Sequence, residues 1–272
     1  MSGINLKLMQ AGGFDIDASE LLPETLRGRK VEEIRSMRLA QGRRQVALGD
    51  LFDVASRDDD VLGIEAATPR LRHLGRNMSG GRLHISGTAG DGLGAGMRAG
   101  TITVDGDAGD FVGSGMRNGL IEISGDAGDF LGGALPNESL GLRNGVVRVG
   151  GSVGARAGER MRRGLLIVNG DAGACCGSGM IAGTIVVTGH CADGIGLGMR
   201  RGTILLTNTP ASIPVTFNPC GTYALAVIEL LRRYVATFDQ RVARKIGRGA
   251  HVQRYAGDRG ANGQGELLIT AP

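Results

Sequence analysis

The sequence predicts an all-β fold: a parallel β-helix, a solenoid of about seven 19-residue coils, with an α/β cap before the coils and a helix after them. Three observations predict it: a fixed spacing of glycines, apolar ladders with the period of a strand, and a composition rich in small residues. The coils are expected over residues 63–208. The N-terminal capping region is then 1–62, and 209–272 is a C-terminal cap or tail with a helix near 222–238.

The repeat is marked by glycines that each follow a Met-x-x or Leu-x-x step. They are Gly81, Gly100, Gly119, Gly145, Gly164, Gly183 and Gly202. Every interval is 19 residues except the one from Gly119 to Gly145, which is 26. A fixed period of this length is typical of solenoids, in which each repeat buries its apolar side against its neighbours. The seven extra residues lie within 132–141 and predict a loop that projects from one face.

Apolar residues occupy the same positions in every coil. The second position after the repeat glycine holds Leu83, Ile102, Ile121, Val147, Leu166, Ile185 and Ile204. The fourth position holds Ile85, Val104, Ile123, Val149, Val168, Val187 and Leu206. A third row precedes the glycine and consists of Met78, Met97, Met116, Leu142, Met161, Met180 and Met199. The alternation is that of a half-buried strand, and stacked coils would form a parallel sheet. A methionine row could bind metal, but filling of the core is the favoured interpretation.

Two further glycine rows are expected at the corners of the coil, where the backbone needs positive φ or close approach of neighbouring turns. Asp107, Asp126 and Asp171 recur at one coil position, and we interpret them as turn caps. Runs such as 92–96 resemble nucleotide-binding fingerprints, but they recur in every coil and no crossover helix follows them. Dinucleotide binding is therefore not predicted.

The chain before the coils lacks the repeat and is expected to form the N-terminal cap. We predict strands at Ile4–Leu8, Gln45–Leu48 and Val61–Ile64, with a short helix around Val31–Met37. Residues 74–81 are predicted to form a degenerate lead-in coil. Such a cap would cover the open end of the stack.

The chain after the coils contains an amphipathic run, residues 222–238, which predicts a helix that packs against the last coil or a partner. Its apolar side would hold Leu225, Ile228, Leu231, Val235 and Phe238. Residues 257–268 predict a glycine-rich turn followed by a strand. This tail also carries the excess of basic residues in a chain of net charge +4. A basic tail can meet an acidic protein surface or an anionic cofactor, whereas the base-reading aromatics of nucleic-acid binders are missing.

Composition narrows the classes of protein. Aromatic residues make up only 3% and glycines number 49, which suits thin, closely stacked coils. No apolar stretch reaches the length of a membrane span, and the N-terminus has no signal-peptide hydrophobic region, so we expect a cytoplasmic protein without membrane contact. Cys175, Cys176, Cys191 and Cys220 lack metal-site spacing and are expected to be free thiols.

The sequence offers no catalytic centre and no metal site. The histidines, His73, His84, His190 and His251, have no ligand spacing, and no nucleophile has a recognisable base partner. The best candidate for a binding site is a row of arginines beside the methionines, broken at Ile181. It consists of Arg98, Arg117, Arg143, Arg162 and Arg200. Paired guanidinium groups would bind an anionic ligand; contacts with a partner or with solvent are the alternatives.

Three stretches carry a resemblance to a known family. They are Gly49–Asp53, the coil pattern G-x-I-x-V-x-G-D-A-G-D-x-x-G-x-G-M-R-x-G, and the ending Arg254–Asp258 with Gly263–Leu267. The chain resembles the C subunit of formylmethanofuran dehydrogenase. Within that family, the excess of arginine over lysine favours the C subunits of the bacterial formyltransferase/hydrolase complex of methylotrophs. The coil pattern alone also resembles the last domain of the large subunit of glutamate synthase, and the flanks favour the formylmethanofuran group.

The resemblance implies a right-handed β-helix that serves as a non-catalytic scaffold in a cytoplasmic complex of four subunits. One partner, a formyltransferase subunit, would move the formyl group between formyl-tetrahydromethanopterin and a methanofuran-type carrier. A second, an amidohydrolase-like hydrolase subunit with a metal site, zinc by implication, would release formate; a third partner would complete the hetero-oligomer. The pathway would be formaldehyde oxidation in one-carbon metabolism. The arginine row would then meet the carrier's polyglutamate tail.

Two alternatives stay open at this point. The chain could be the C subunit of a molybdenum- or tungsten-dependent formylmethanofuran dehydrogenase, whose partner subunits would contain metal-pterin and iron–sulfur clusters. It could also be an independent structural module like that of glutamate synthase. The sequence leaves open the stoichiometry, the identity of the carrier, and whether the arginine row contacts ligand, partner or solvent.

Overall fold

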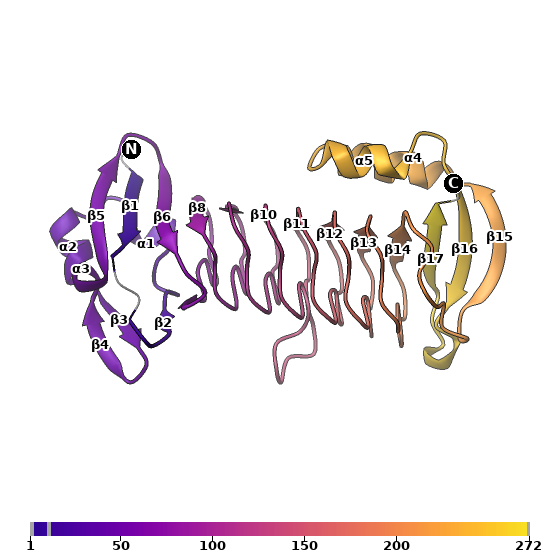
Figure 1. Cartoon of the computed structure of the whole chain (residues 1–272), viewed down its shortest axis with the longest axis horizontal. Coiled ribbons are helices and arrows are strands. Elements are labelled where there is room, and N and C mark those ends of the chain that lie inside the picture. Colours follow the sequence, from indigo (N-terminus) through magenta and orange to yellow (C-terminus); the bar gives the residue numbers. More distant parts are fainter. Residues whose placement is uncertain (1–2, 10–11, 271–272) are drawn as a thin grey trace.

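The chain forms an elongated column of stacked strands with a cap at each end (Figure 1). This is a computed structural model that describes residues 3–9 and 12–270. The central strands run parallel, one from each coil: β8 (Arg82–Gly87), β9 (Thr101–Val104), β10 (Leu120–Ile123), β11 (Val146–Val149), β12 (Leu165–Val168), β13 (Thr184–Val187) and β14 (Thr203–Leu206). They belong to a 13-stranded sheet that is mostly parallel. The predicted β-rich fold with a large parallel sheet is confirmed.

The two apolar ladders and the methionine row face the inside of the column. In the register of β9 and β10, Ile102 lies opposite Ile121 and Val104 opposite Ile123. The same register continues from β8 to β14. No side chain of the three rows is more than 1% exposed. Each layer therefore buries its apolar residues against equivalent residues of the layers before and after it.

Glycine is required at the repeat position for two reasons. At Gly119 the backbone has a φ of +109°, which side chains rarely adopt, and an added Cβ would lie 2.8 Å from the carbonyl oxygen of Gly100. In the row that ends the strand, Gly87 has a positive φ, of +114°, and the other positions need glycine for close approach. At Gly106 an added Cβ would lie 2.6 Å from the carbonyl oxygen of Gly87 in the previous coil. The coils thus pack too closely at these corners for any side chain.

The N-terminal cap combines sheet and helix, as the sequence predicts. It contains β1 (Gly3–Leu8), β2 (Ile16–Asp17), α1 (Pro23–Leu26), α2 (Val31–Ser36), β3 (Arg38–Gln41), β4 (Arg44–Ala47), α3 (Leu48–Leu51), β5 (Phe52–Arg57), β6 (Val61–Ala67) and β7 (Leu71–Arg72). Strand β6 pairs in parallel with both β1 and β8, with Leu62 opposite Ile4 and Leu83. The inner ladder therefore continues into the cap, and the expected division between residues 62 and 63 falls within β6. In the lead-in coil, residues 74–81, Met78 is fully buried.

The C-terminal region also extends the ladder. Its elements are β15 (Asn218–Ala224), α4 (Ala226–Ala236), α5 (Gln240–Ile246), β16 (His251–Gly257), the 3-10 turn η1 (Arg259–Ala261) and β17 (Gly265–Thr270). Strand β17 pairs in parallel with β14, with Leu267 opposite Ile204. It thus adds one more layer before β16 and β15 continue the sheet in antiparallel fashion.

The single helix predicted near 222–238 is wrong in its bounds. Thr222 and Ala224 belong to β15, where they pair with Gln253 and His251 of β16. The helix α4 is shorter, and a second helix follows because the Asp239 carboxylate accepts hydrogen bonds from the first backbone N–H groups of α5. The sequence pattern could not separate strand from helix here, because the register with β16 depends on a segment far along the chain.

The expected packing of this helix against the last coil is confirmed at Leu205 of β14, and the contact extends over earlier coils. Together α4 and α5 lie along the outer side of several coils and form a second core with the strands beneath them (Figure 1). From the sheet this core takes Val146, Leu165, Ile167, Val186, Leu205, Val252 and Leu268. The predicted apolar side of the helix does face it: Ile228 and Val235 are buried, and Leu225, Leu231 and Phe238 pack partly buried around them. We call residues 226–246 the clip.

The insertion at 132–141 leaves the column as a loop on the opposite side from the clip (Figure 1). The parallel pairing of β10 with β11 is uninterrupted across it, with Ile121 opposite Val147. The predicted outward loop is therefore confirmed, and it overhangs a surface that also bears part of the arginine row.

Candidate functional site

The arginine row follows one edge of the column. The backbone N–H of each row residue donates to the carbonyl of the ladder residue one coil earlier; for Arg117 the acceptor is Met97, at 2.7 Å. The same bond holds Ile181, at 2.8 Å from the oxygen of Met161, so the row is interrupted in side chain and not in backbone. Arg98, Arg117, Arg162 and Arg200 are exposed, and Arg143 is half-buried. The structure therefore aligns these residues, but it divides them between two recesses.

The first recess has a volume of about 160 Å³ and lies beneath the insertion loop. The arginines that line it are Arg76, Arg98, Arg117 and Arg143, and the loop contributes Leu135, Glu138 and Leu140. Within the described part of the chain, the fully buried Ser114 hydroxyl at this site has no hydrogen-bond partner. The Glu138 carboxylate lies 3.7 Å from the Arg143 guanidinium. Four cations around one acid leave an excess of positive charge for an anion.

The second recess, about 490 Å³, surrounds the interruption at Ile181. Arg162 and Arg163 lie on one side of it, Arg200 and Arg201 on the other, with Asn262 and Gln264 at the edge. Because Ile181 and Ala182 are uncharged and shorter than arginine, the layer between the two arginine pairs is hollow. The sequence analysis did not predict Arg163 and Arg201 as part of this site. Both directly follow row residues in the sequence, and this position was the signal that could have indicated them.

Most of the row has no acidic partner among the residues that the structure describes. Among residues 3–9 and 12–270, ion pairs within 4 Å involve Arg143 but none involves Arg98, Arg117, Arg162 or Arg200. Guanidinium groups at one per layer present pairs of planar donors to carboxylate or phosphate oxygens. The arrangement can hold an extended anion with several charges along the column.

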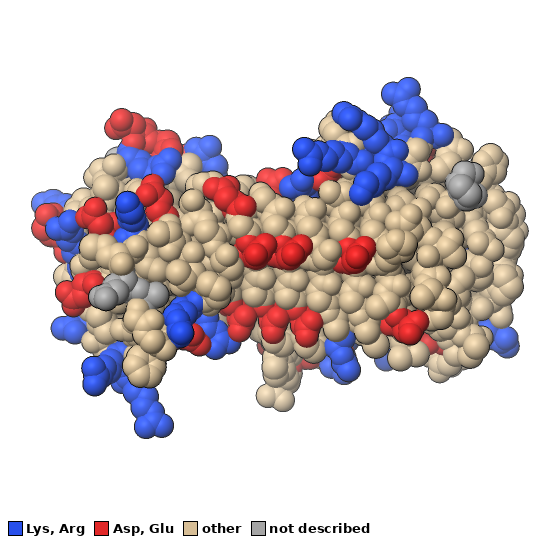
Figure 2. Space-filling view, viewed as in Figure 1, with Lys and Arg blue, Asp and Glu red and all other residues tan. Residues whose placement is uncertain are grey.

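The recurring aspartates have a structural role. The Asp107 carboxylate accepts a hydrogen bond from the backbone N–H of Asp126, 2.8 Å away, and Asp126 does the same for Ser152 at 2.7 Å. A second row behaves alike, with Asp110 accepting from the N–H of Asp129 at 2.8 Å. Figure 2 shows them as two lines of acidic side chains along the column. The caps therefore act on the following coil, which ties neighbouring layers together.

The cysteines are free thiols, as predicted. A hydrogen bond with Cys191 and full burial raise the pKa of the Cys176 thiol well above its usual range, so this thiol stays protonated. Two histidines contact neighbouring side chains: His73 Nδ1 lies 3.3 Å from an Asp17 carboxylate oxygen, and His84 Nδ1 lies 2.9 Å from the Thr103 hydroxyl. Over the described ranges, no group of three or more His, Cys, Asp and Glu side chains could hold a metal ion.

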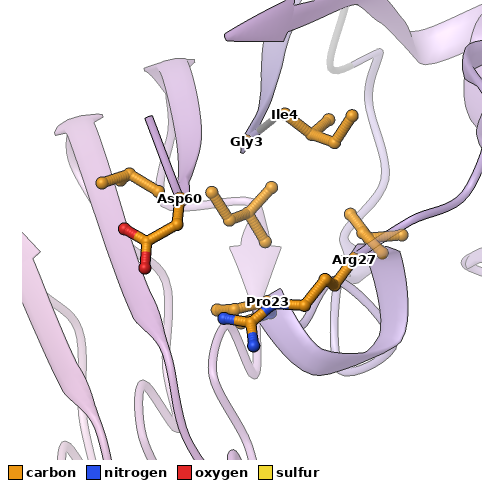
Figure 3. A pocket seen from close by; sticks show the side chains of 8 residues that line it. Gly3, Ile4, Pro23, Arg27 and Asp60 are labelled. Carbon is orange, nitrogen blue, oxygen red and sulfur yellow. The ribbon is translucent and has the colours of Figure 1, made fainter. Parts of the chain in front are cut away.

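A further hollow, in the N-terminal cap, is too small for a substrate. Its volume is about 20 Å³, the space of a single water molecule. Figure 3 shows that its walls come from three segments of the cap, represented by Ile4, Pro23 with Arg27, and Asp60. No described helix is long and apolar enough to cross a membrane.

Comparison with known proteins identifies the repeat region. The sequence model of the GXGXG motif family matches residues 70–245, most of the chain and all of the described coils from β8 onward. The chain belongs to the GXGXG motif family.

Relatives with curated names are C subunits of formylmethanofuran dehydrogenase. The C subunit of the molybdenum-containing formylmethanofuran dehydrogenase 1 of Methanothermobacter marburgensis is 31% identical over 77 residues, which is 28% of this chain and 19% of the relative. The C subunit of the tungsten-containing formylmethanofuran dehydrogenase 2 of Methanococcus maripaludis is 28% identical over 92 residues, 33% of this chain and 34% of the relative. The chain thus spans only about a fifth to a third of the length of these relatives.

One solved structure matches the chain from end to end. It is a chain from the crystal structure of the formyltransferase/hydrolase complex FhcABCD from Methylorubrum extorquens in complex with methylofuran. The TM-score is 0.91 and the identity 34%, over 98% of this chain and 100% of that one. The resemblance stated from the sequence is confirmed, and it includes the two caps as well as the coils.

Proposed function

We propose that this chain is a non-catalytic scaffold subunit of a cytoplasmic formyltransferase/hydrolase complex in one-carbon metabolism. In this complex a partner transfers the formyl group of formyl-tetrahydromethanopterin to the amine of a methanofuran-type carrier. Another partner, with a metal in its site, adds water to the formyl carbon, which releases formate and the free carrier amine. This chain, a right-handed β-helix with a cap before residue 63 and another after residue 208, holds the partners in position.

The end-to-end match to a chain of the complex from Methylorubrum extorquens carries this proposal. A shared coil pattern alone could come from any member of the motif family, since stacked coils impose their own glycines and apolar ladders. Caps are not dictated by the stacking. That the cap strands β5 and β15 at the two ends of the sheet fall within a match of 98% of the chain favours a common assembly.

The described surface suits a scaffold. Rods of stacked coils present long surfaces at fixed spacing, roughly 4.8 Å per layer, to partners along their length. The seven strands from β8 to β14 provide such a surface, with a projecting loop on one side and the clip on the other. The clustered guanidinium groups that line the two recesses support a role in binding and orienting anions.

The arginine row is proposed to bind the anionic tail of the carrier. Arg98, Arg117 and Arg143 around the first recess would pair with successive carboxylates, and Arg162 with Arg200 would continue the contact across the second. To test this, Arg98, Arg117 and Arg143 are changed to Gln together. Affinity of the purified complex for a methanofuran-type carrier with an oligoglutamate tail should fall roughly tenfold or more.

A matched control replaces three exposed arginines of the N-terminal cap, Arg29, Arg43 and Arg44, with Gln. An equal loss of carrier affinity in the control would mean that the effect comes from the overall positive charge and not from the row. Unchanged carrier affinity and formate production in the row variant would refute the role of the row, without touching the scaffold proposal.

The scaffold proposal is tested by purifying the tagged chain from its own cells. We expect it to co-purify with three other polypeptides that together convert formyl-tetrahydromethanopterin to formate, with neither molybdenum nor tungsten present. Recovery of the chain alone, as an active monomer, would refute it.

A second candidate is the C subunit of a molybdenum- or tungsten-dependent formylmethanofuran dehydrogenase, which the relatives matched over about a third of the chain favour. The same purification decides between the two. Molybdenum or tungsten with iron–sulfur clusters in the partners would select the dehydrogenase.

A further inference from the structure

The first recess, beneath the insertion loop, contains buried donors that no group of the chain pairs with. Its lining includes Ser114, whose hydroxyl is fully buried, and Arg143, whose Nε atom is buried as well. Neither atom has a hydrogen-bond partner among the residues that the structure describes. Buried donors without acceptors are costly and rare in native proteins, so two of them in one recess indicate an acceptor that the chain does not supply.

A third donor comes from the backbone. At this coil position the N–H group of other coils donates to the following coil: Gly96 to the oxygen of Ser114 and Gly179 to the oxygen of Leu197, both at 2.8 Å. Within the described part of the chain the N–H of Gly115 makes no such bond, since the following coil carries the insertion loop at this point. A Cβ added at Gly115 would meet nothing within 4 Å. The N–H of this residue, which lines the recess, is therefore also left for a ligand.

The hollow arises from small residues in two successive layers. Residues 95–96 and 114–115 are Ala-Gly and Ser-Gly, whereas residues 76–77, at the same coil positions one layer earlier, are Arg-Asn. The insertion loop closes the other side with Leu135 and Leu140. The enclosed volume of about 160 Å³ is well below the roughly 300–1,000 Å³ of pockets for drug-sized ligands, so the recess suits one compact group.

Positive charge surrounds these donors. Arg76, Arg98 and Arg117 line the recess, and over the described ranges none of them forms an ion pair within 4 Å. The acid in the lining is Glu138 of the insertion loop, 3.7 Å from Arg143. An oxyanion offers several acceptor oxygens together with a negative charge, so it satisfies the buried donors and the excess charge at once. Water would satisfy only the donors, and a cation or an apolar group neither.

We propose that the first recess is a binding site for one compact oxyanion, a carboxylate or a phosphate. The donors of Ser114, Gly115 and Arg143 bind its oxygen atoms, and the other arginines of the lining neutralise its charge. Two sources supply this chemistry: the end of the carrier's anionic tail and free inorganic phosphate. The first source rests on the proposed function and would fix where the tail ends along the row; the second does not depend on it.

The Glu138 carboxylate competes with such an anion. At 3.7 Å from Arg143 it is too far away for a hydrogen bond, and its negative charge lies where the anion would bind. Removal of this charge should therefore tighten binding, in contrast to changes at the donors.

The test measures the binding of two probes, inorganic phosphate and tetraglutamate, to the purified full-length chain by isothermal titration calorimetry. Ser114→Ala removes the buried hydroxyl and Arg76→Gln removes a charge, and neither residue belongs to the arginine row. The matched control is Ser178→Ala. Ser178 occupies the coil position of Ser114 three coils further on, its hydroxyl is likewise buried without a partner in the described chain, and it lines neither recess. Thermal unfolding establishes that each variant is folded.

Wild type should bind at least one probe at a single site per chain. Ser114→Ala and Arg76→Gln should each weaken this binding roughly fivefold or more, and Ser178→Ala should leave it unchanged. Glu138→Gln should tighten it about twofold or more. A loss confined to tetraglutamate identifies the tail as the occupant, and a loss confined to phosphate identifies the free anion. The inference is overturned if wild type binds neither probe saturably, if folded Ser114→Ala and Arg76→Gln bind as wild type does, or if Ser178→Ala loses as much.

The role proposed for the arginine row fails or stands separately. Weaker carrier binding by the combined Arg98, Arg117 and Arg143 variant, with unchanged probe binding by Ser114→Ala, would support the row and overturn the compact site. Phosphate binding that Ser114→Ala weakens, with unchanged carrier affinity in the row variant, would support the compact site and refute the role of the row.

Discussion

The strands of the early coils and those of the late coils share one buried face and differ in the other. In β9 and β10 only the second and fourth residues are buried, and Thr103 or Glu122 lies between them on the outer side. In β12 all four residues are buried, including Leu165 and Ile167 on the outer side. The inner ladder is the same throughout, so the stacking of coils does not decide what the outer side contains.

The difference teaches that one repeat can carry two independent patterns. The residues at the inner positions are determined by contacts with the neighbouring coils, and these contacts are equivalent in every layer. The outer positions depend on what lies over them: solvent above β9 and above Glu122 of β10, and the clip above β11 to β14, with Leu120 of β10 packed partly buried at its edge. Position Arg148 of β11 stands at the boundary, where it contacts the clip through a charge instead of an apolar group.

The largest effect is expected on the inner face and should be equal in the two regions. Ile102→Ala and Ile185→Ala each remove a fully buried side chain and should lower the free energy of unfolding by about 3–4 kcal/mol. Urea denaturation measures both. A cost that differed severalfold between the early and the late coil would break the premise that the inner ladder is uniform.

The next effect concerns the bond that fastens the clip at the boundary. Asp239 Oδ2 lies 2.6 Å from Arg148 Nε, and its side chain is only 2% exposed. Asp239→Asn removes the charge and leaves the Arg148 guanidinium without its carboxylate partner, while the amide oxygen can still cap α5, so we expect a loss of about 2–4 kcal/mol. The exposed pair of Arg35 and Asp53 is the control: Asp53→Asn should cost less than about 0.5 kcal/mol.

The same bond predicts a dependence on pH. Burial alone would raise the pKa of Asp239, but hydrogen bonds from the Val242 and Arg241 N–H groups and from Arg148 outweigh it and hold that pKa below its ordinary value of 3.8. A carboxylate with a lowered pKa contributes stability above the pKa of the unfolded chain, and this is lost as pH falls toward the folded value. The stability difference between wild type and Asp239→Asn should therefore shrink below about pH 4. A difference that persisted unchanged to lower pH would contradict this assignment.

A smaller effect separates the outer faces directly. Val186 lies under the clip and is fully buried, whereas Glu122 occupies the same coil position without cover. Val186→Ala should cost about 2 kcal/mol, and Glu122→Ala should change stability by no more than about 0.5 kcal/mol. Equal losses of unfolding free energy for the two variants in chemical denaturation would mean that the clip does not exclude solvent from the outer face of β13.

The smallest effect is expected on the outer side of the clip itself. Hydrogen bonds from Arg232 and Arg233 lower the pKa of Glu229 to about 2, although the group lies at the surface, with Arg233 exposed and Glu229 and Arg232 half-buried. Glu229→Gln should leave the thermal midpoint nearly unchanged, in contrast to Asp239→Asn, because exposed ion pairs contribute little. Titration of the Glu229 carboxyl by NMR should still show the lowered pKa; an ordinary value would mean that the pair with Arg232 does not form in solution.

Much of this architecture could be predicted from the sequence, because the pattern that forms the inner ladder is contained within each single coil. One coil of 19 residues carries its own glycines and apolar residues, and repetition aligns them. That the end strands β6 and β17 pair with the ladder was harder to predict, because their sequences lack the glycine pattern of the coils. The clip was mistaken for one longer helix because the apolar run of 222–238 continues through the end of β15.

A signal for the clip was nevertheless present. The strands Leu165–Val168 and Thr203–Leu206 are apolar on both faces, which indicates a cover on each side. The binding role of the arginine row stays a prediction, but the alignment of the row was predictable, since it shares the period of the coils. Its division into two recesses was not, because that depends on the insertion loop and on Arg76, Arg163 and Arg201, which lie outside the row.

The register of the coils underlies every assignment above, and a distance along the column tests it most directly. Asn118 and Arg201 are exposed and occupy equivalent positions four layers apart, so spin labels on cysteines introduced there should lie roughly 19 Å apart. Electron–electron double resonance should give one narrow distribution near that distance, allowing for the label arms. A broad distribution, or one centred beyond about 30 Å, would contradict the stacking of one coil on the next.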